Sequence, residues 1–66
     1  MTILLNGEAR QLEGARDVPE LLTELGVSSH ALLVEHNGLA LRLEEWPYRL
    51  LTEGDRVEII QIVAGG

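Results

Sequence analysis

At 66 residues the chain suits one small domain, 1–66, because a fold of this size buries only about 60% of the surface that its unfolded chain exposes; an enzyme with a deep pocket of its own is not expected. Cysteine is absent, which excludes disulfides, thiolate metal ligands and thiol nucleophiles. The net charge of -6 argues against nucleic acid and anionic membranes as partners. With no membrane-length apolar run and no signal-like N-terminus, we expect a cytoplasmic protein.

The N-terminal residues predict a β-hairpin. Strands are expected over residues 2–6 and 8–12. Between them stands Asn6-Gly7, a dipeptide that tolerates the positive φ angles of a tight turn. The domain is therefore expected to open with two antiparallel strands.

A short helix is predicted next. Asp17 stands at the capping position, with Pro19 in the first turn and Glu20 at capping-box spacing. Gly26 supplies a C-terminal cap. Apolar residues recur at helical spacing between these caps, so they share one face of the helix: Val18, Leu21, Leu22 and Leu25.

The second half of the chain predicts three more strands, over residues 31–36, 39–43 and 56–63. Asn37-Gly38 is a second hairpin signal. Residues 44–46 are expected to form a single turn that stops at Pro47, and residues 53–55 a turn before the last strand. That last strand is β-branched and apolar enough for the centre of a sheet. We expect the apolar helix face to pack on Ile3, Leu5, Val34, Val57 and Ile59.

Five segments, in this order and over nearly the whole chain, resemble the ThiS family of thiamin-biosynthesis sulfur carriers. They are ILLNGE at 3–8, VEHNG at 34–38, EW at 45–46, EGDRVEI at 53–59 and VAGG at 63–66. The resemblance implies an α+β fold of the ubiquitin-like β-grasp type, a mixed sheet of about five strands on one helix in the order ββαβββ. The family usually has Pro-Arg shortly before Glu-Trp, where this chain has Arg42-Leu43. A one-residue displacement turns a strand side chain to the other face, so no role is carried over to Arg42.

The candidate working group is the C-terminal carboxylate of Gly66. Two glycines directly follow an apolar strand, with residues 64–66 expected as a flexible tail. Lacking Cβ, glycine lets a tail enter a narrow channel and leaves its carbonyl open to attack. The carboxylate is ionised at neutral pH, so it is a poor electrophile and needs activation by another protein.

The resemblance implies how that activation proceeds. A ubiquitin-activating-type adenylyltransferase would adenylate Gly66 with ATP and Mg²⁺, with Ala64, Gly65 and Gly66 inserted in its active site. A persulfide donor such as a cysteine desulfurase would supply sulfur to leave a thiocarboxylate. The thiocarboxylate would pass its sulfur to thiazole synthase. The chain would then be a substrate of enzymes, without catalytic residues or a bound cofactor or metal of its own.

An exposed docking patch is predicted on the sheet. Glu35 interrupts an apolar strand and marks its solvent face, which Leu33 shares by alternation. The ubiquitin-like pattern places three more apolar residues on the same outer side, so the candidate patch is Leu4, Leu33, Ile60 and Ile62.

Other polar and aromatic residues are interpreted as structural. His30 and His36 lack cysteine or helically spaced histidine partners, which argues against a metal site. Glu44 and Glu45 are neighbours and do not share a face, so no carboxylate dyad is expected. Trp46 is interpreted as a plug at the edge of the core.

Three alternatives to a thiamin sulfur carrier remain open from the sequence. The first is a carrier like the small subunit of molybdopterin synthase, which is usually longer and approaches its diglycine through prolines. The second is a ubiquitin-like protein modifier. The third is a noncatalytic β-grasp interaction module with an incidental glycine tail. The chain has no lysine, which excludes chains of the protein built on its own lysines.

Overall fold

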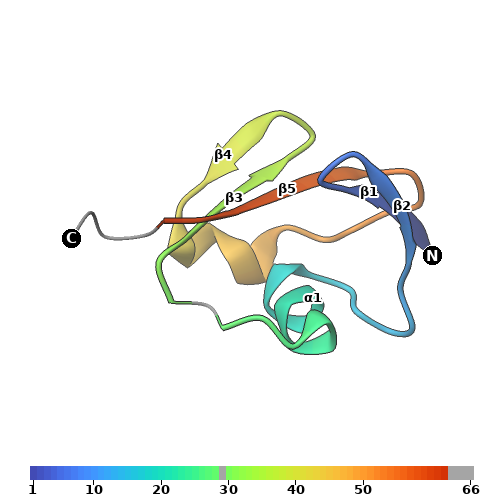
Figure 1. The fold of residues 1–66 in the computed structure, drawn as a ribbon, viewed down its shortest axis with the longest axis horizontal. Coiled ribbons are helices and arrows are strands. Elements are labelled where there is room, and N and C mark those ends of the chain that lie inside the picture. The colour runs from blue at the N-terminus through green and yellow to red at the C-terminus, as the bar shows by residue number, and fades with distance from the viewer. Residues whose placement is uncertain (29, 63–66) are drawn as a thin grey trace.

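The computed structural model describes residues 1–28 and 30–62. They form one five-stranded sheet with strand order β2-β1-β5-β3-β4. Figure 1 shows helix α1 and the 3-10 helix η1 on the same side of this sheet. The elements are β1 Thr2–Leu5, β2 Glu8–Gln11, α1 Val18–Leu25, β3 Leu32–His36, β4 Leu39–Leu41, η1 Leu43–Tyr48 and β5 Arg56–Gln61.

The sheet is mixed, as predicted, and β5 is its central strand. β5 runs parallel to β1 and antiparallel to β3, while β1–β2 and β3–β4 are antiparallel hairpins. The order ββαβββ and the β-grasp arrangement are confirmed. The strand that leads to the C-terminus therefore has a hydrogen-bonded neighbour on each side and is not an edge strand.

Helix α1 begins and ends at the predicted caps. Asp17 Oδ1 accepts a hydrogen bond from Glu20 N at 2.9 Å. At the other end Gly26 has φ 70°, and its N–H donates to Thr23 O at 3.1 Å. Val27 N donates to Leu22 O at 2.9 Å, which completes a Schellman motif.

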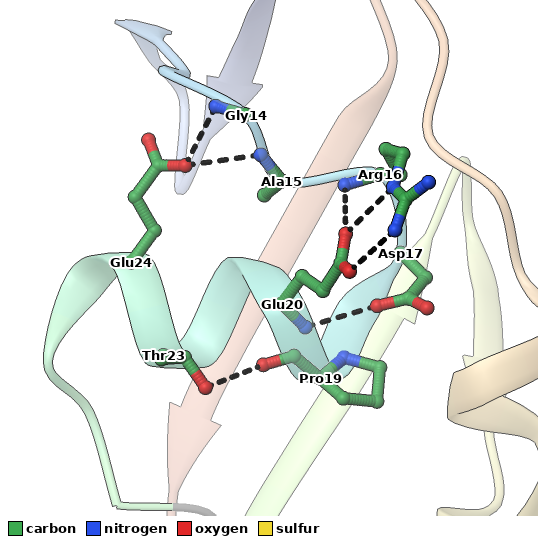
Figure 2. A network of polar contacts seen from close by, with 8 residues as sticks. All are labelled: Gly14, Ala15, Arg16, Asp17, Pro19, Glu20, Thr23 and Glu24. Carbon is green, nitrogen blue, oxygen red and sulfur yellow. Dashed lines mark hydrogen bonds and ion pairs between the residues drawn. The ribbon is translucent and has the colours of Figure 1, made fainter.

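The predicted capping box forms only in part. The Glu20 carboxylate accepts from Arg16 N at 2.8 Å and pairs with Arg16 Nη2 at 3.1 Å, so it binds one residue before the cap (Figure 2). The hydrogen bond from the Arg16 side chain lowers the pKa of Glu20. The carboxylate of Glu24 accepts from the backbone N–H groups of Glu13, Gly14 and Ala15 at 2.6 to 3.1 Å. It ties the loop before the helix to the last helical turn.

The prediction that Pro47 stops a turn was wrong. Helix η1 continues to Tyr48 because Arg49 N donates to Trp46 O at 3.3 Å, a bond that needs no donor on Pro47. The start of η1 at Leu43 also shortens the strand expected over residues 39–43 to Leu39–Leu41.

Three further strand boundaries differ from the prediction by one residue. β2 ends at Gln11 and not at residue 12. Ala31 has φ 56°, outside the β region, so β3 begins one residue later than expected. Asn6 has φ 50° and belongs to the turn, so β1 ends at Leu5. β5 ends at Gln61; the predicted extension through Val63 falls partly outside the described residues.

The core lies between α1 and the inner sheet face, as predicted. Ile3, Val34 and Val57 meet Val18, Leu21 and Leu22 there, with Leu5, Leu25 and Ile59 half-buried around them. Four other core residues were not predicted from the sequence: Leu12, Ala15, Leu41 and Leu51. Trp46 is buried, with 4% of its surface exposed, in agreement with its role as a plug.

No helix within the described ranges is long and apolar enough to cross a membrane.

Candidate functional site

The predicted working end follows directly from β5. Ile62 N donates to Ala31 O at 2.8 Å, so the chain stays hydrogen-bonded to its neighbour one residue beyond the strand. The predicted tail, Ala64, Gly65 and Gly66, lies outside the described residues. The structure describes the strand that leads to this tail, β5.

The asparagines of both hairpin turns form hydrogen bonds to the backbone of β5. Asn6 Oδ1 accepts from Ile59 N at 2.8 Å, and Asn6 Nδ2 donates to Ile59 O at 3.3 Å. Asn37 Oδ1 accepts from Arg56 N at 2.8 Å. The two asparagines have φ angles of 50° and 52°, which Asn tolerates better than most residues. The turn signals of the sequence therefore also fix the position of β5.

Three of the four predicted patch residues come together on the outer face. Leu33 and Ile60 are directly opposite each other on β3 and β5. Ile62 lies one residue beyond β5, and continuing the strand alternation from Ile60 puts it on the same side. About half of each side chain is exposed. Leu4 is also exposed, but it lies opposite Arg56, four residues from Ile60, or about 13 Å along the strand at 3.3 Å per residue. The outer face thus carries one apolar cluster, here called the outer cluster (Leu33, Ile60 and Ile62), and a separate Leu4.

A polar hollow adjoins the outer cluster. Glu35 and Glu58 are directly opposite each other, one step of the strand alternation away from Leu33 and Ile60. Together with Gly38 and Arg56 they line a shallow hollow of about 160 Å³. Apolar and acidic groups therefore stand side by side on the same two strands.

A buried polar network on the inner side was not predicted. Asp55 Oδ2 lies 2.7 Å from His36 Nε2, and Arg49 Nε donates to His36 Nδ1 at 3.2 Å. A guanidinium can only donate, so Nδ1 is the acceptor in this bond, and the other ring nitrogen, Nε2, donates to Asp55. The alternation of His36 with buried Val34 could have placed it on the inner face.

The carboxylate of Asp55 is saturated with donors. It also accepts from Asn37 Nδ2 at 3.1 Å and from the N–H and hydroxyl of Thr52, each at 2.8 Å. Burial alone would raise the pKa of Asp55, but the hydrogen bonds, first that from His36, outweigh it and hold the pKa well below its usual range. Both His36 nitrogens are occupied, so this network is structural. Among the described residues no cluster of three acidic, histidine or cysteine side chains is suited to a metal.

A cleft lies between α1 and η1. It has a volume of about 330 Å³ and is lined on one side by Leu22 and on the other by Leu43 and Trp46. None of its lining side chains is ionisable, and its hydroxyl, that of Thr23, donates to Pro19 O at 3.1 Å. The cleft therefore offers no acid, base or nucleophile.

These features define a small β-grasp domain whose central strand leads into a diglycine terminus. A sequence model of the ThiS family matches residues 3–66. The chain belongs to the ThiS family.

Solved and curated relatives agree with this assignment. The crystal structure of the thiamine biosynthesis protein ThiS of Geobacter metallireducens superimposes with a TM-score of 0.84 at 33% identity, covering 100% of both chains. The sulfur carrier protein ThiS of Thermus thermophilus is 41% identical over 64 residues, 97% of this chain and 98% of the relative. That of Escherichia coli is 30% identical over 66 residues, 100% of both chains.

A longer relative is also similar. A thiazole synthase of Paramagnetospirillum magneticum is 33% identical over 66 residues, which is 100% of this chain and 20% of that protein. The chain thus spans a fifth of that relative, in which the similar segment shares one polypeptide with the rest of the synthase.

Proposed function

We propose that this protein is a sulfur carrier of thiamin biosynthesis and that the Gly66 carboxylate carries the sulfur. The observation that carries the proposal is the family match, which runs through the last residue of the chain. Full-length similarity to two curated sulfur carriers supports it. The cleft without ionisable groups suits a protein on which enzymes act.

The proposed chemistry takes place on Gly66 in three steps. A carboxylate oxygen attacks the α-phosphorus of ATP, and pyrophosphate leaves to give an acyl-adenylate. The terminal sulfur of an enzyme persulfide then attacks the acyl carbon and AMP leaves, which gives an acyl disulfide. A thiol cleaves the S–S bond, forming a disulfide with the donor's sulfur and leaving the thiocarboxylate. The carrier contributes an unhindered terminus, because neither Gly65 nor Gly66 has a side chain.

Three partners follow from this chemistry. They are an adenylyltransferase of the ubiquitin-activating type that uses ATP and Mg²⁺, a persulfide donor such as a cysteine desulfurase, and a thiazole synthase. The thiazole synthase relative that contains a similar segment supports the last of these. Because activation consumes ATP, the proposed location is the cytoplasm.

The proposed docking patch is the outer cluster, with Leu4 as a peripheral contact. Exposed apolar clusters on small proteins mark interaction surfaces. The outer cluster lies at the C-terminal end of β5, the end to which the predicted tail is attached in the sequence.

Reconstitution tests this proposal. The chain is incubated with the activating enzyme and persulfide donor of the same organism, ATP and Mg²⁺, and its intact mass is measured. A thiocarboxylate, seen as the replacement of one oxygen by sulfur, is expected. An isopeptide adduct to another protein would instead indicate a modifier, and an unchanged mass with active enzymes would indicate a noncatalytic module.

A further inference from the structure

The outer sheet face carries two carboxylates in an unfavourable arrangement. Glu35 on β3 and Glu58 on β5 are directly opposite each other in the antiparallel ladder. Side chains so placed have Cβ atoms about 5 Å apart, and like charges in such pairs destabilise a sheet. The sheet therefore holds an electrostatic repulsion beside the outer cluster.

Among the described residues neither Glu35 nor Glu58 forms an ion pair. The Arg16–Glu20 ion pair and the His36–Asp55 contact both lie elsewhere, and neither includes Glu35 or Glu58. Arg56 lies two residues from Glu58 and lines the same hollow, but it is not within ion-pair distance of either carboxylate. A cation from another molecule would relieve the repulsion.

We propose that Glu35 and Glu58 together receive a lysine or arginine side chain of thiazole synthase, whose apolar side chains cover Leu33 and Ile60. The inference rests on the proposed function and deepens it, because it states the chemistry of the partner surface. Two observations carry it: the charge of the pair, and its continuity with the apolar side chains on the same two strands. Thiazole synthase is the partner because a relative contains both parts in one chain.

The arrangement also explains why the pair is tolerated. Complementary charges at the rim of an interface speed association and exclude partners of the wrong charge. Because the carboxylate pair stands next to the apolar cluster, a partner surface with a basic side chain beside its apolar area binds better than a surface that is only apolar. The repulsion between the two carboxylates in the free protein is offset when the basic side chain of the partner binds.

The test compares two variants that each remove two negative charges. Glu35→Gln/Glu58→Gln alters the pair, and Glu8→Gln/Glu44→Gln alters exposed carboxylates on β2 and η1 that have no hydrogen bonds among the described residues. Binding to purified thiazole synthase of the same organism is measured by calorimetry at low and high salt. We expect the first variant to bind about tenfold more weakly, with a shallower salt dependence, and the control to stay within about twofold of the wild type.

Stability separates a binding role from a structural one. The variant Glu35→Arg places opposite charges across the strands, so its melting temperature is expected to rise while its affinity for thiazole synthase falls. Affinity equal to that of the control would overturn the proposal. A loss of affinity together with a lower melting temperature would also overturn it, since the carboxylates would then be structural.

The same proteins distinguish this inference from the proposed function. If the wild type acquires a thiocarboxylate and donates sulfur to thiazole synthase while the first double variant binds normally, the carrier function stands and the carboxylate inference fails. If only binding to the activating enzyme is weakened, the assignment to thiazole synthase is wrong. If the wild type never acquires sulfur, the proposed function itself fails.

Discussion

His36 Nε2 lies 2.7 Å from Asp55 Oδ2, a buried contact that joins β3 to the turn from which β5 starts. Three further hydrogen bonds from Asn37 and Thr52 end on the same carboxylate. The start of the central strand is thus fixed by one acidic residue. This network links the stability of the carrier to pH.

Replacing Asp55 by Asn should destabilise the protein at neutral pH by about 1 to 3 kcal/mol, the usual cost of leaving a buried hydrogen-bonding group without its partner. The wild type should also lose stability in acid. The pKa of Asp55 is lower folded than unfolded, so its contribution is complete above the unfolded value near 4 and is lost as the pH falls further. Urea unfolding at pH 6 and pH 3 measures both effects. An equal loss in the variant and the wild type between these pH values would contradict the role of Asp55.

Leu22→Ala should cost about 2 to 5 kcal/mol of folding stability, because it leaves a cavity where α1 meets the core. Leu22 is 3% exposed, whereas Leu50 is 68% exposed and gives a matched control for the same substitution. Thermal and urea unfolding of the two variants are compared. Similar stability of the Leu22 and Leu50 variants would remove Leu22 from the core.

Ile60→Thr should weaken binding to thiazole synthase about tenfold and leave folding nearly unchanged, because it removes apolar contact area while keeping a β-branched residue in the strand. Leu39→Thr is the control, since Leu39 is 50% exposed and Ile60 51%. Leu39 lies on β4, outside the outer cluster. Calorimetric titration with thiazole synthase measures the difference, and equal affinities would show that the cluster does not dock this partner.

The sequence predicted most of the fold because its local signals agree with one another. The sequence predicts a turn at Asn6-Gly7, a helix start at Asp17 and a helix end at Gly26, and the structure has all three at these residues. The exceptions depend on competition between hydrogen-bond partners. Glu20 binds Arg16 in place of the cap residue, and the bond from Arg49 N carries η1 past Pro47. A spacing rule cannot decide such competition.

The candidate site was predicted less completely because it depends on strand order. Alternation with Glu35 correctly predicted the exposure of Leu33, and the ubiquitin-like pattern that of Leu4 and Ile60. Neither could give the register in which Leu4 stands opposite Arg56, away from the other two. The contact between His36 and Asp55 spans 19 residues and likewise follows only from the pairing of β3 with β5.

Deleting Gly66, or adding one residue after it, should leave the melting curve almost unchanged but abolish adenylation. Deletion withdraws the carboxylate by up to about 3.5 Å, the span of one extended residue, which is comparable with the whole distance between reacting atoms. Extension turns the Gly66 carboxylate into an amide. Pyrophosphate release by the activating enzyme is measured for each variant. Wild-type rates in both folded variants would show that the diglycine is not the working end.

The most direct test of the sulfur-carrier account is the location of sulfur on the chain itself. The protein is isolated from cells that make thiamin and fragmented in a mass spectrometer without prior digestion. The account predicts that one oxygen is replaced by sulfur in the C-terminal fragments that contain Gly66, and that this change disappears when the activating enzyme is deleted. A chain without this replacement in cells that actively make thiamin, or added sulfur located elsewhere in the sequence, would contradict it.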